Sequence, residues 1–292
     1  MLQIHRGIAF HVARGNPVGQ AFPVNSMLEI EFAQLSDPGK MRETNEDFLG
    51  YSSPISAEQA RKRGWLFALA DGVGGQDRGE VASRIAVDTL VSGFAEFPAS
   101  EPASGLLQKL VHSANLRICE TAAGTGPAGS SMCTTLVACV LRFNRITVAH
   151  VGDSRCYLIR RGHASPLTAD HTLVGEQVRL GLLSSEEAAA SERRNLLSRS
   201  LGGNLFVNAA IDEHQLLAGD IILLSSDGLH GSVTSNEIAA IVGKFHGLQE
   251  AAQGLVSLAC EKDGSDNVSV QLVRIKGVER VGMYRGRPYQ LR

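Results

Sequence analysis

The sequence has no long apolar run, no strong excess of charge of one sign and no paired cysteine motif. None of its apolar stretches approaches the ~18 consecutive apolar residues of a membrane-spanning helix. His5, Arg6, His11 and Arg14 interrupt the apolar residues of the N-terminus, so we expect no signal peptide. A net charge of −2 provides no basic surface for nucleic acid. We therefore expect a protein that binds neither membranes nor nucleic acid.

The cysteines argue against a zinc site or a disulfide framework. They are five, an odd number, and none is spaced as CxxC. Cys133, Cys139 and Cys156 lie in apolar runs that are typical of strands. We interpret the set as reduced, mostly buried thiols and expect a cytoplasmic protein.

The hydrophobic pattern predicts an antiparallel β-structure with two pairs of helices. Alternation and short apolar runs predict strands at residues 29–33, 48–51, 65–70, 134–141, 146–151, 156–160, 207–211, 221–225 and 267–275. Helical spacing predicts helices at residues 81–97, 106–122, 234–243 and 247–261. The turns at residues 143–145 and 152–155 are too short for a parallel crossover. This pattern favours the α+β class, with a β-sandwich covered by helices.

A single domain at residues 27–275 accounts for most of the chain. Residues 1–26 contain several Gly and Pro residues without a sustained period, so we expect a loosely ordered extension. Residues 166–200 are polar, with short helical pieces. Residues 276–292 form a short basic tail, which we expect to be solvated.

Acidic residues gather where the predicted strands begin or end. Rigid strand ends can aim several carboxylates at one point, and carboxylate oxygens are the ligands that Mg²⁺ and Mn²⁺ prefer. Should these strands be neighbours, the acids converge at one edge of the sandwich and repel one another unless cations lie between them. The acids are Glu46, Asp47, Asp71, Asp153, Asp227 and Asp266.

Two of these acids also have a simpler interpretation. Asp71-Gly72 and Asp227-Gly228 are Asp-Gly pairs, which are common in turns. Neither pair joins two predicted strands as a hairpin turn does, because each continues into a Gly-rich or helical segment. The spacing of these two Asp-Gly pairs is compatible with either a turn or a metal site.

Six motifs in order along the chain together resemble the protein phosphatase 2C family. They are GKMRETNED at residues 39–47, DGVGG at 71–75, GEVAS at 79–83, VGDSR at 151–155, SDGL at 226–229 and DNV at 266–268. The resemblance extends from about Met27 to Ile275, and its compactness resembles the bacterial members. It implies two antiparallel sheets flanked by helix pairs, a two-metal site at one edge, and residues 166–200 as the flap beside that site.

The resemblance also implies a ligand set for two Mn²⁺ or Mg²⁺ ions. Asp71 would bridge both ions, and Asp227 and Asp266 would complete the first site. The carbonyl oxygen of Gly72 would bind the second ion, whose waters Glu46 and Asp47 would hold.

The implied chemistry is direct hydrolysis of phosphoserine and phosphothreonine. A water shared by the two cations would attack phosphorus without a covalent phosphoenzyme. Arg42 would bind the phosphate oxygens, because a guanidinium fork matches them better than an ammonium group does.

Three positions depart from the family pattern. Val73 stands where eukaryotic relatives carry a histidine proposed as general acid, so that role is not carried over. Cys133 replaces a common glycine, and we interpret its thiol as packing only. Gly231 stands where many members have an aspartate, which predicts a weak third metal site that keeps Asp153. We interpret the adjacent His230 as a surface histidine, with a substrate or metal contact as the alternative.

The expected function is therefore a metal-dependent serine/threonine protein phosphatase. Its partners would be phosphorylated proteins and a cognate kinase that it opposes, and we expect a monomer. The alternative is a phosphatase-like regulatory module without turnover. The presence of Asp71, Asp227 and Asp266 favours the enzyme, because inactive relatives usually lose such ligands.

Overall fold

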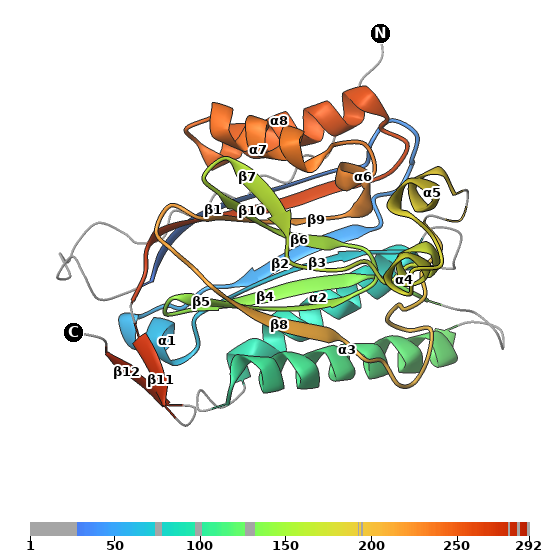
Figure 1. The fold of residues 1–292 in the computed structure, drawn as a ribbon. Helices are drawn as coiled ribbons and strands as arrows, with labels where there is room; N and C mark the ends of the chain where they lie inside the picture. The colour runs from blue at the N-terminus through green and yellow to red at the C-terminus, as the bar shows by residue number, and fades with distance from the viewer. Residues whose placement is uncertain are drawn as a thin grey trace, which may run out of the picture.

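Two stacked antiparallel sheets lie between two layers of helices (Figure 1). The structure is a computed structural model and describes residues 28–73, 78–96, 101–125, 132–191, 193, 195–279, 281–284 and 287–290. The extension predicted at residues 1–26 lies outside these ranges. No described helix has the length and apolar character needed to cross a bilayer.

Each of the two large sheets has five strands. The first has the order β1 (Glu29–Asp37), β10 (Val268–Gly277), β9 (Ile221–Ser225), β6 (Arg155–Arg160) and β7 (His163–Pro166). The second has the order β2 (Asp47–Ser52), β3 (Trp65–Asp71), β4 (Leu136–Arg142), β5 (Arg145–Val151) and β8 (Ala210–Gln215). All neighbouring strands are antiparallel.

Two helix pairs cover the outer faces of the sandwich. Helices α2 (Gly79–Glu96) and α3 (Ala103–Thr125) lie against the second sheet, and α7 (Ser235–Lys244) and α8 (Leu248–Lys262) lie against the first (Figure 1). A third apolar cluster fills the space between the sheets. This architecture confirms the predicted α+β sandwich.

The alternation of side chains that builds the core also places polar residues at strand ends. In β3, Leu66 and Ala68 pack toward the helices, whereas Phe67 and Leu69 pack between the sheets. Asp71 is two residues beyond Leu69, so the period of two places it on the inter-sheet side. The strand that builds the core therefore also places an acid at its edge.

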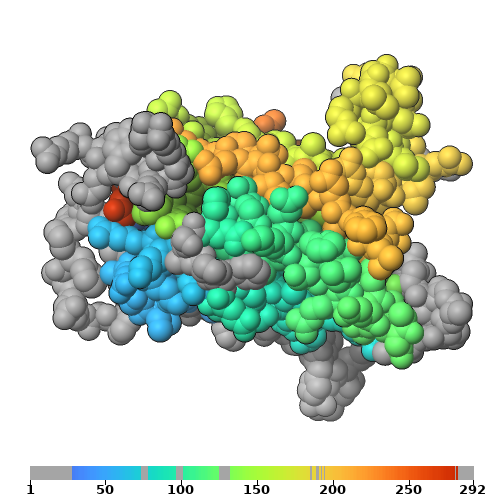
Figure 2. Space-filling view, turned by 90° about the horizontal axis from the view of Figure 1, so that it is seen from below, coloured from blue at the N-terminus to red at the C-terminus, as the bar shows by residue number. Residues whose placement is uncertain are grey.

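The remaining elements are short. They are α1 (Ala57–Lys62), α4 (Leu173–Arg179), α5 (Ser185–Ala190), α6 (Asp227–His230), β11 (Val281–Tyr284) and β12 (Arg287–Gln290). Figure 2 shows the segment of α4 and α5, in yellow, standing out from one end of the body. Within the basic tail, β11 and β12 pair as a small antiparallel sheet.

One predicted strand was misplaced. The strand expected at residues 207–211 is instead β8 at Ala210–Gln215. This strand lies at the edge of its sheet and pairs only with β5 among the described strands. Asp212 and Glu213 point into solvent there, so the apolar residues before them gave a misleading signal. The short strand β7 was missed for a related reason, because its edge position leaves it polar.

Candidate metal centre

The acids predicted at strand ends converge at one edge of the sandwich. Asp47 and Asp71 are directly opposite partners in the β2–β3 ladder. From the facing sheet, Asp227 begins α6 directly after β9, and Asp266 precedes β10. Asp153 follows β5 and is 7% exposed. Both sheets thus supply carboxylates to one place.

Burial and mutual repulsion make this cluster hard to ionise without a cation. Burial raises the pKa of Asp47 to about 7, with smaller contributions from Asp227 and Asp266. Burial also raises the pKa of Asp153 to about 7 and that of Asp227 to about 6. The pKa of Asp71 is raised well above its ordinary value, first by burial and then by Asp47 and Asp227. A bound cation would reverse these shifts by stabilising the anions.

One carboxyl oxygen of the cluster has no hydrogen-bond partner among the described residues. This atom is Asp47 Oδ1, which is buried. Asp71 and Asp227 lie close enough for each to affect the pKa of the other.

No three described His, Cys, Asp or Glu side chains already surround a common point as metal ligands. A cation bound here would displace protons from these carboxyls, whose pKa values are raised. All the converging acids offer oxygen atoms, so the donor set fits Mg²⁺ or Mn²⁺.

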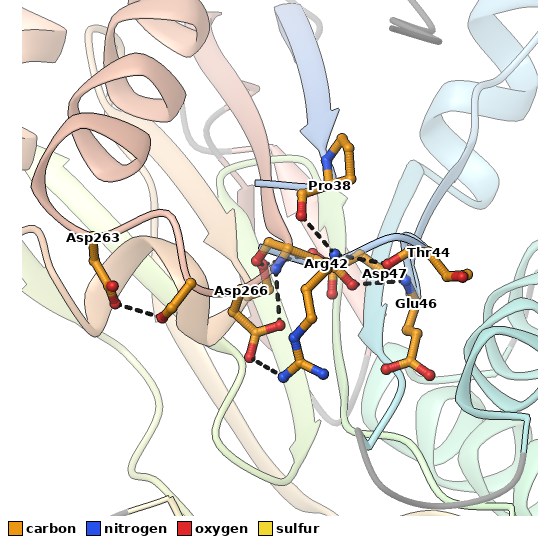
Figure 3. A network of polar contacts seen from close by, with 10 residues as sticks. Pro38, Arg42, Thr44, Glu46, Asp47, Asp263 and Asp266 are labelled. Atoms are coloured by element: carbon orange, nitrogen blue, oxygen red, sulfur yellow. Dashed lines mark hydrogen bonds and ion pairs between the residues drawn. The ribbon is translucent and has the colours of Figure 1, made fainter. Parts of the chain in front are cut away.

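Arg42 lies between Asp266 and Glu46 (Figure 3). Its Nη2 donates to Asp266 Oδ2 at 2.8 Å, and both side chains are partly exposed. Burial raises the pKa of Glu46, and the nearby Arg42 opposes this shift. The one cation in this group therefore sits at the open side of the acids, where an anionic substrate could reach it.

Asn267 fixes the loop that carries Arg42 and Glu46. Its Nδ2 donates to the carbonyl oxygens of Pro38 at 3.0 Å and Thr44 at 3.1 Å, and its Oδ1 accepts from the Glu46 N–H at 2.7 Å. Asn267 belongs to the DNV motif at residues 266–268, but the motif alone assigns it no role. Its position directly after Asp266 was the available signal.

The backbone around Asp71 is held by two hydroxyls. Thr135 Oγ1 accepts from the Asp71 N–H at 3.0 Å, and Thr134 Oγ1 donates to the Asp71 carbonyl at 2.8 Å. Gly72 follows and donates its N–H to the Glu46 carbonyl at 3.1 Å. A Cβ at Gly72 would lie 2.5 Å from the Gly79 backbone, so no other residue fits between β3 and the start of α2.

The interpretation of His230 as a surface histidine is wrong. The ring is mostly buried, and its Nε2 forms a 3.0 Å hydrogen bond with the Asp153 carbonyl oxygen. Burial lowers its pKa to about 3. His230 thus supports the backbone of Asp153. The neighbouring Gly231 has φ of −66°, a helical value that any residue can adopt.

The segment predicted as a flap is tied to the same edge. Arg155 Nε and Nη2 donate to the two carboxylate oxygens of Asp170 at 2.8 and 2.7 Å. The His171 N–H donates to the Gly152 carbonyl at 3.0 Å, and His171 Nδ1 accepts from the Gly152 N–H at 3.2 Å. The residues flanking Asp153 therefore anchor the start of this segment.

Comparison with known proteins identifies the family. The model of the protein phosphatase 2C family matches residues 44–260. A serine/threonine phosphatase of Listeria innocua is 34% identical over 86% of this chain and 96% of its own length. The crystal structure of the phosphatase Stp1 of Staphylococcus aureus has a TM-score of 0.78 at 30% identity, covering 89% of this chain and all of its own.

A further solved structure is that of the catalytic domain of the phosphatase PstP in complex with two manganese ions. It has a TM-score of 0.72 at 32% identity and covers 85% of this chain and 99% of its own. The chain therefore belongs to the protein phosphatase 2C family, the metal-dependent phosphatases of serine and threonine residues in proteins, as its motifs predicted.

Proposed function

We propose that this phosphatase removes phosphate from serine and threonine side chains of cytoplasmic proteins and opposes a cognate kinase. The observation that carries the proposal is the convergence of buried acids from both sheets beside one arginine. We also propose that the enzyme acts as a monomer, because its site is built from one chain.

We assign the metal centre residue by residue. Asp71 lies near both Asp47 and Asp227 and would contact both ions. Asp227 and Asp266 would complete one site, and the Gly72 carbonyl would contribute to the other. Glu46 and Asp47 would hold that ion through its waters, and Asp153 would serve a weak third site. When bound, two such cations supply an activated water and offset negative charge on the phosphate.

The protein residues position the substrate for that water. Arg42 would bind two phosphate oxygens through its fork, releasing Asp266 when the site is loaded. Asn267 keeps the Arg42 loop against β10, so the guanidinium stays aligned with the acids. Val73 offers no proton donor, so the leaving hydroxyl would take its proton from solvent or from the attacking water.

An assay on a phosphothreonine peptide tests this proposal. We expect turnover with Mn²⁺ or Mg²⁺ and none in excess chelator, since no cysteine nucleophile or base-activated serine was found in the sequence. Full activity in chelator would contradict the metal mechanism. Absence of turnover under every metal condition would favour a regulatory module instead.

A further inference from the structure

The carboxyl group of Asp47 lies beside hydroxyl groups from the opposite sheet. Asp47 belongs to β2 of the second sheet and is 7% exposed. Ser226 directly follows β9 of the first sheet, and its Oγ donates to Asp47 Oδ2 at 2.8 Å. The hydroxyl of Ser269, in β10, lies near the same carboxylate and acts to lower its pKa, against the larger effect of burial. One carboxylate oxygen is therefore held, while Oδ1 stays buried without a partner among the described residues.

The Ser226 hydroxyl both accepts and donates. The Ser269 N–H donates to Ser226 Oγ at 2.9 Å. The single proton of the hydroxyl is donated to Asp47 Oδ2, the nearer of two acceptors. The alternative acceptor, the Asn267 carbonyl, is 3.5 Å away and weaker.

A second series of hydrogen bonds connects Asn45, Ser36 and Ser269 near Asp47. The Asp47 N–H donates to Asn45 Oδ1 at 3.1 Å, which fixes the orientation of the Asn45 amide. Asn45 Nδ2 then donates to Ser36 Oγ at 2.7 Å, and Ser36 Oγ lies 2.7 Å from Ser269 Oγ. Because the Asn45 nitrogen can only donate, Ser36 Oγ accepts from it and keeps its own proton for a bond to Ser269 Oγ.

We propose that Ser226 and Ser269, with Ser36 and Asn45 behind them, are positioning residues that hold the Asp47 carboxyl group with Oδ1 turned to the metal centre. The inference rests on the proposed place of Asp47 in that centre. The Ser226 hydroxyl donates to Oδ2, and Ser269 lies beside the same carboxyl group. Oδ1 is then the oxygen available to a metal ion or its water.

Metal binding by metal-free protein tests this without relying on turnover. Titration calorimetry with Mn²⁺ should show about ten- to hundredfold weaker binding for Ser226→Ala and for Ser269→Ala, the usual effect of removing a partner of a metal ligand. Ser225→Ala is the matched control. Ser225 is the neighbouring residue in β9, is 0% exposed, and its Oγ has no hydrogen-bond partner within the described structure. Its affinity for Mn²⁺ should equal that of the unmodified protein.

The half-buried Ser36 provides a milder variant. Ser36→Ala leaves both hydroxyls beside Asp47 in place, and circular dichroism can verify that each variant is folded. Ser36→Ala removes only the hydrogen bond that Ser36 makes with Ser269. The Ser36→Ala variant should therefore lose less Mn²⁺ affinity than Ser269→Ala. Wild-type affinity in folded Ser226→Ala and Ser269→Ala would overturn the proposal.

A double-mutant comparison separates this inference from the site assignment. In an Asp47→Asn background, Ser226→Ala should cause no further loss of Mn²⁺ affinity, because its effect passes through the carboxylate. An equal loss in both backgrounds would show that Ser226 acts elsewhere and would overturn the inference alone. Asp47→Asn binding Mn²⁺ as tightly as wild type would overturn the assignment of Asp47 to the metal centre, and this inference with it.

Discussion

The guanidinium of Arg42 donates to the Asp266 carboxylate at 2.8 Å, which pairs the proposed phosphate ligand with a proposed metal ligand. The two side chains are 40% and 37% exposed, so the pair itself contributes at most about 1 kcal/mol to stability. The pair matters for alignment. A metal ion that binds Asp266 would break this hydrogen bond and leave Arg42 available to bind the substrate phosphate.

Arg42→Ala should therefore affect catalysis far more than stability. A charge-assisted hydrogen bond contributes about 1.5–3 kcal/mol, so kcat/KM on a phosphothreonine peptide should fall roughly ten- to a few hundredfold. Arg145→Ala is a control, because Arg145 is an exposed arginine paired with Glu213 in β8. An unchanged kcat/KM for Arg42→Ala would show that Arg42 is only a surface charge.

Asp71→Asn and Asp227→Asn should each abolish turnover while the metal-free protein becomes more stable. Each change replaces a buried carboxyl that is costly to ionise with a neutral amide of the same shape. Removing about 1 kcal/mol of repulsion would raise Tm by roughly 2–4 °C for a domain of this size. Calorimetric melting and rate measurements check both effects. Rates within about tenfold of wild type, ~1.4 kcal/mol, would refute the ligand assignment.

Stabilisation by Mn²⁺ should increase with pH. The pKa values of Asp47 and Asp153 rise from 3.8 to about 7 in the folded protein without metal. The stability that these two carboxyls provide is present below the unfolded pKa and is lost as pH rises through about 7, because the folded state binds more protons in that window. A cation must displace those protons, so its binding is weak in acid.

The measurement is the difference in Tm with and without Mn²⁺, from about pH 5.5 to about pH 8. Histidines with lowered pKa values, such as His171 at about 4, destabilise the folded state as pH falls below 6.5. They do so with or without metal, so their effect cancels in the difference. A difference that is constant across this range would mean that no carboxyl proton is displaced.

Asn267→Ala should release the loop that carries Arg42. The change leaves two carbonyls and one N–H of that loop without their partner, which should cost at least about 2 kcal/mol of stability. KM for the phosphopeptide should also rise, since Arg42 loses its alignment.

Asn115→Ala is the matched control for that variant. Asn115 is 0% exposed and likewise makes three hydrogen bonds to a loop backbone, at Gly202, Asn204 and Leu205. A similar loss of stability with an unchanged KM is expected there. Equal KM values for the two variants would show that Asn267 is structural only.

Gly231→Asp should tighten the weak third metal site. The helical φ of Gly231 accepts a side chain, although the new Cβ would lie 3.0 Å from the Asp227 carbonyl oxygen and must shift slightly. Gly243→Asp adds the same charge in open space on α7 and serves as control. Titration calorimetry should show a stronger third binding event for Gly231→Asp alone. A tight third ion in the unmodified protein would contradict the predicted weak site.

The sequence predicted the sandwich and the convergence of the acids because both follow from local patterns. The period of two in β3 places Phe67, Leu69 and Asp71 on one side, and this can be read without a structure. Edge strands such as β7 and β8 were harder, because their side chains face solvent and carry no apolar period.

The supporting residues of the site depend on contacts between distant segments. Ser226 meets Asp47 across 179 positions of sequence, and Asn267 meets Glu46 across 221. The residues next to them in the sequence do not indicate either contact. His230 was misread for the same reason, since its burial comes from packing near Arg155 and Asp153 rather than from α6 itself.

A crystal structure of the Mn²⁺-loaded protein, with manganese located by anomalous scattering, tests the proposed centre most directly. Two ions about 3.5–4 Å apart are expected, the usual separation in two-metal hydrolases. The Asp71 carboxylate should lie between them, Asp227 should be separated from Asp71, and Asp266 should have exchanged Arg42 for metal. Manganese bound elsewhere in an active protein, away from Asp71, Asp227 and Asp266, would contradict the assignment.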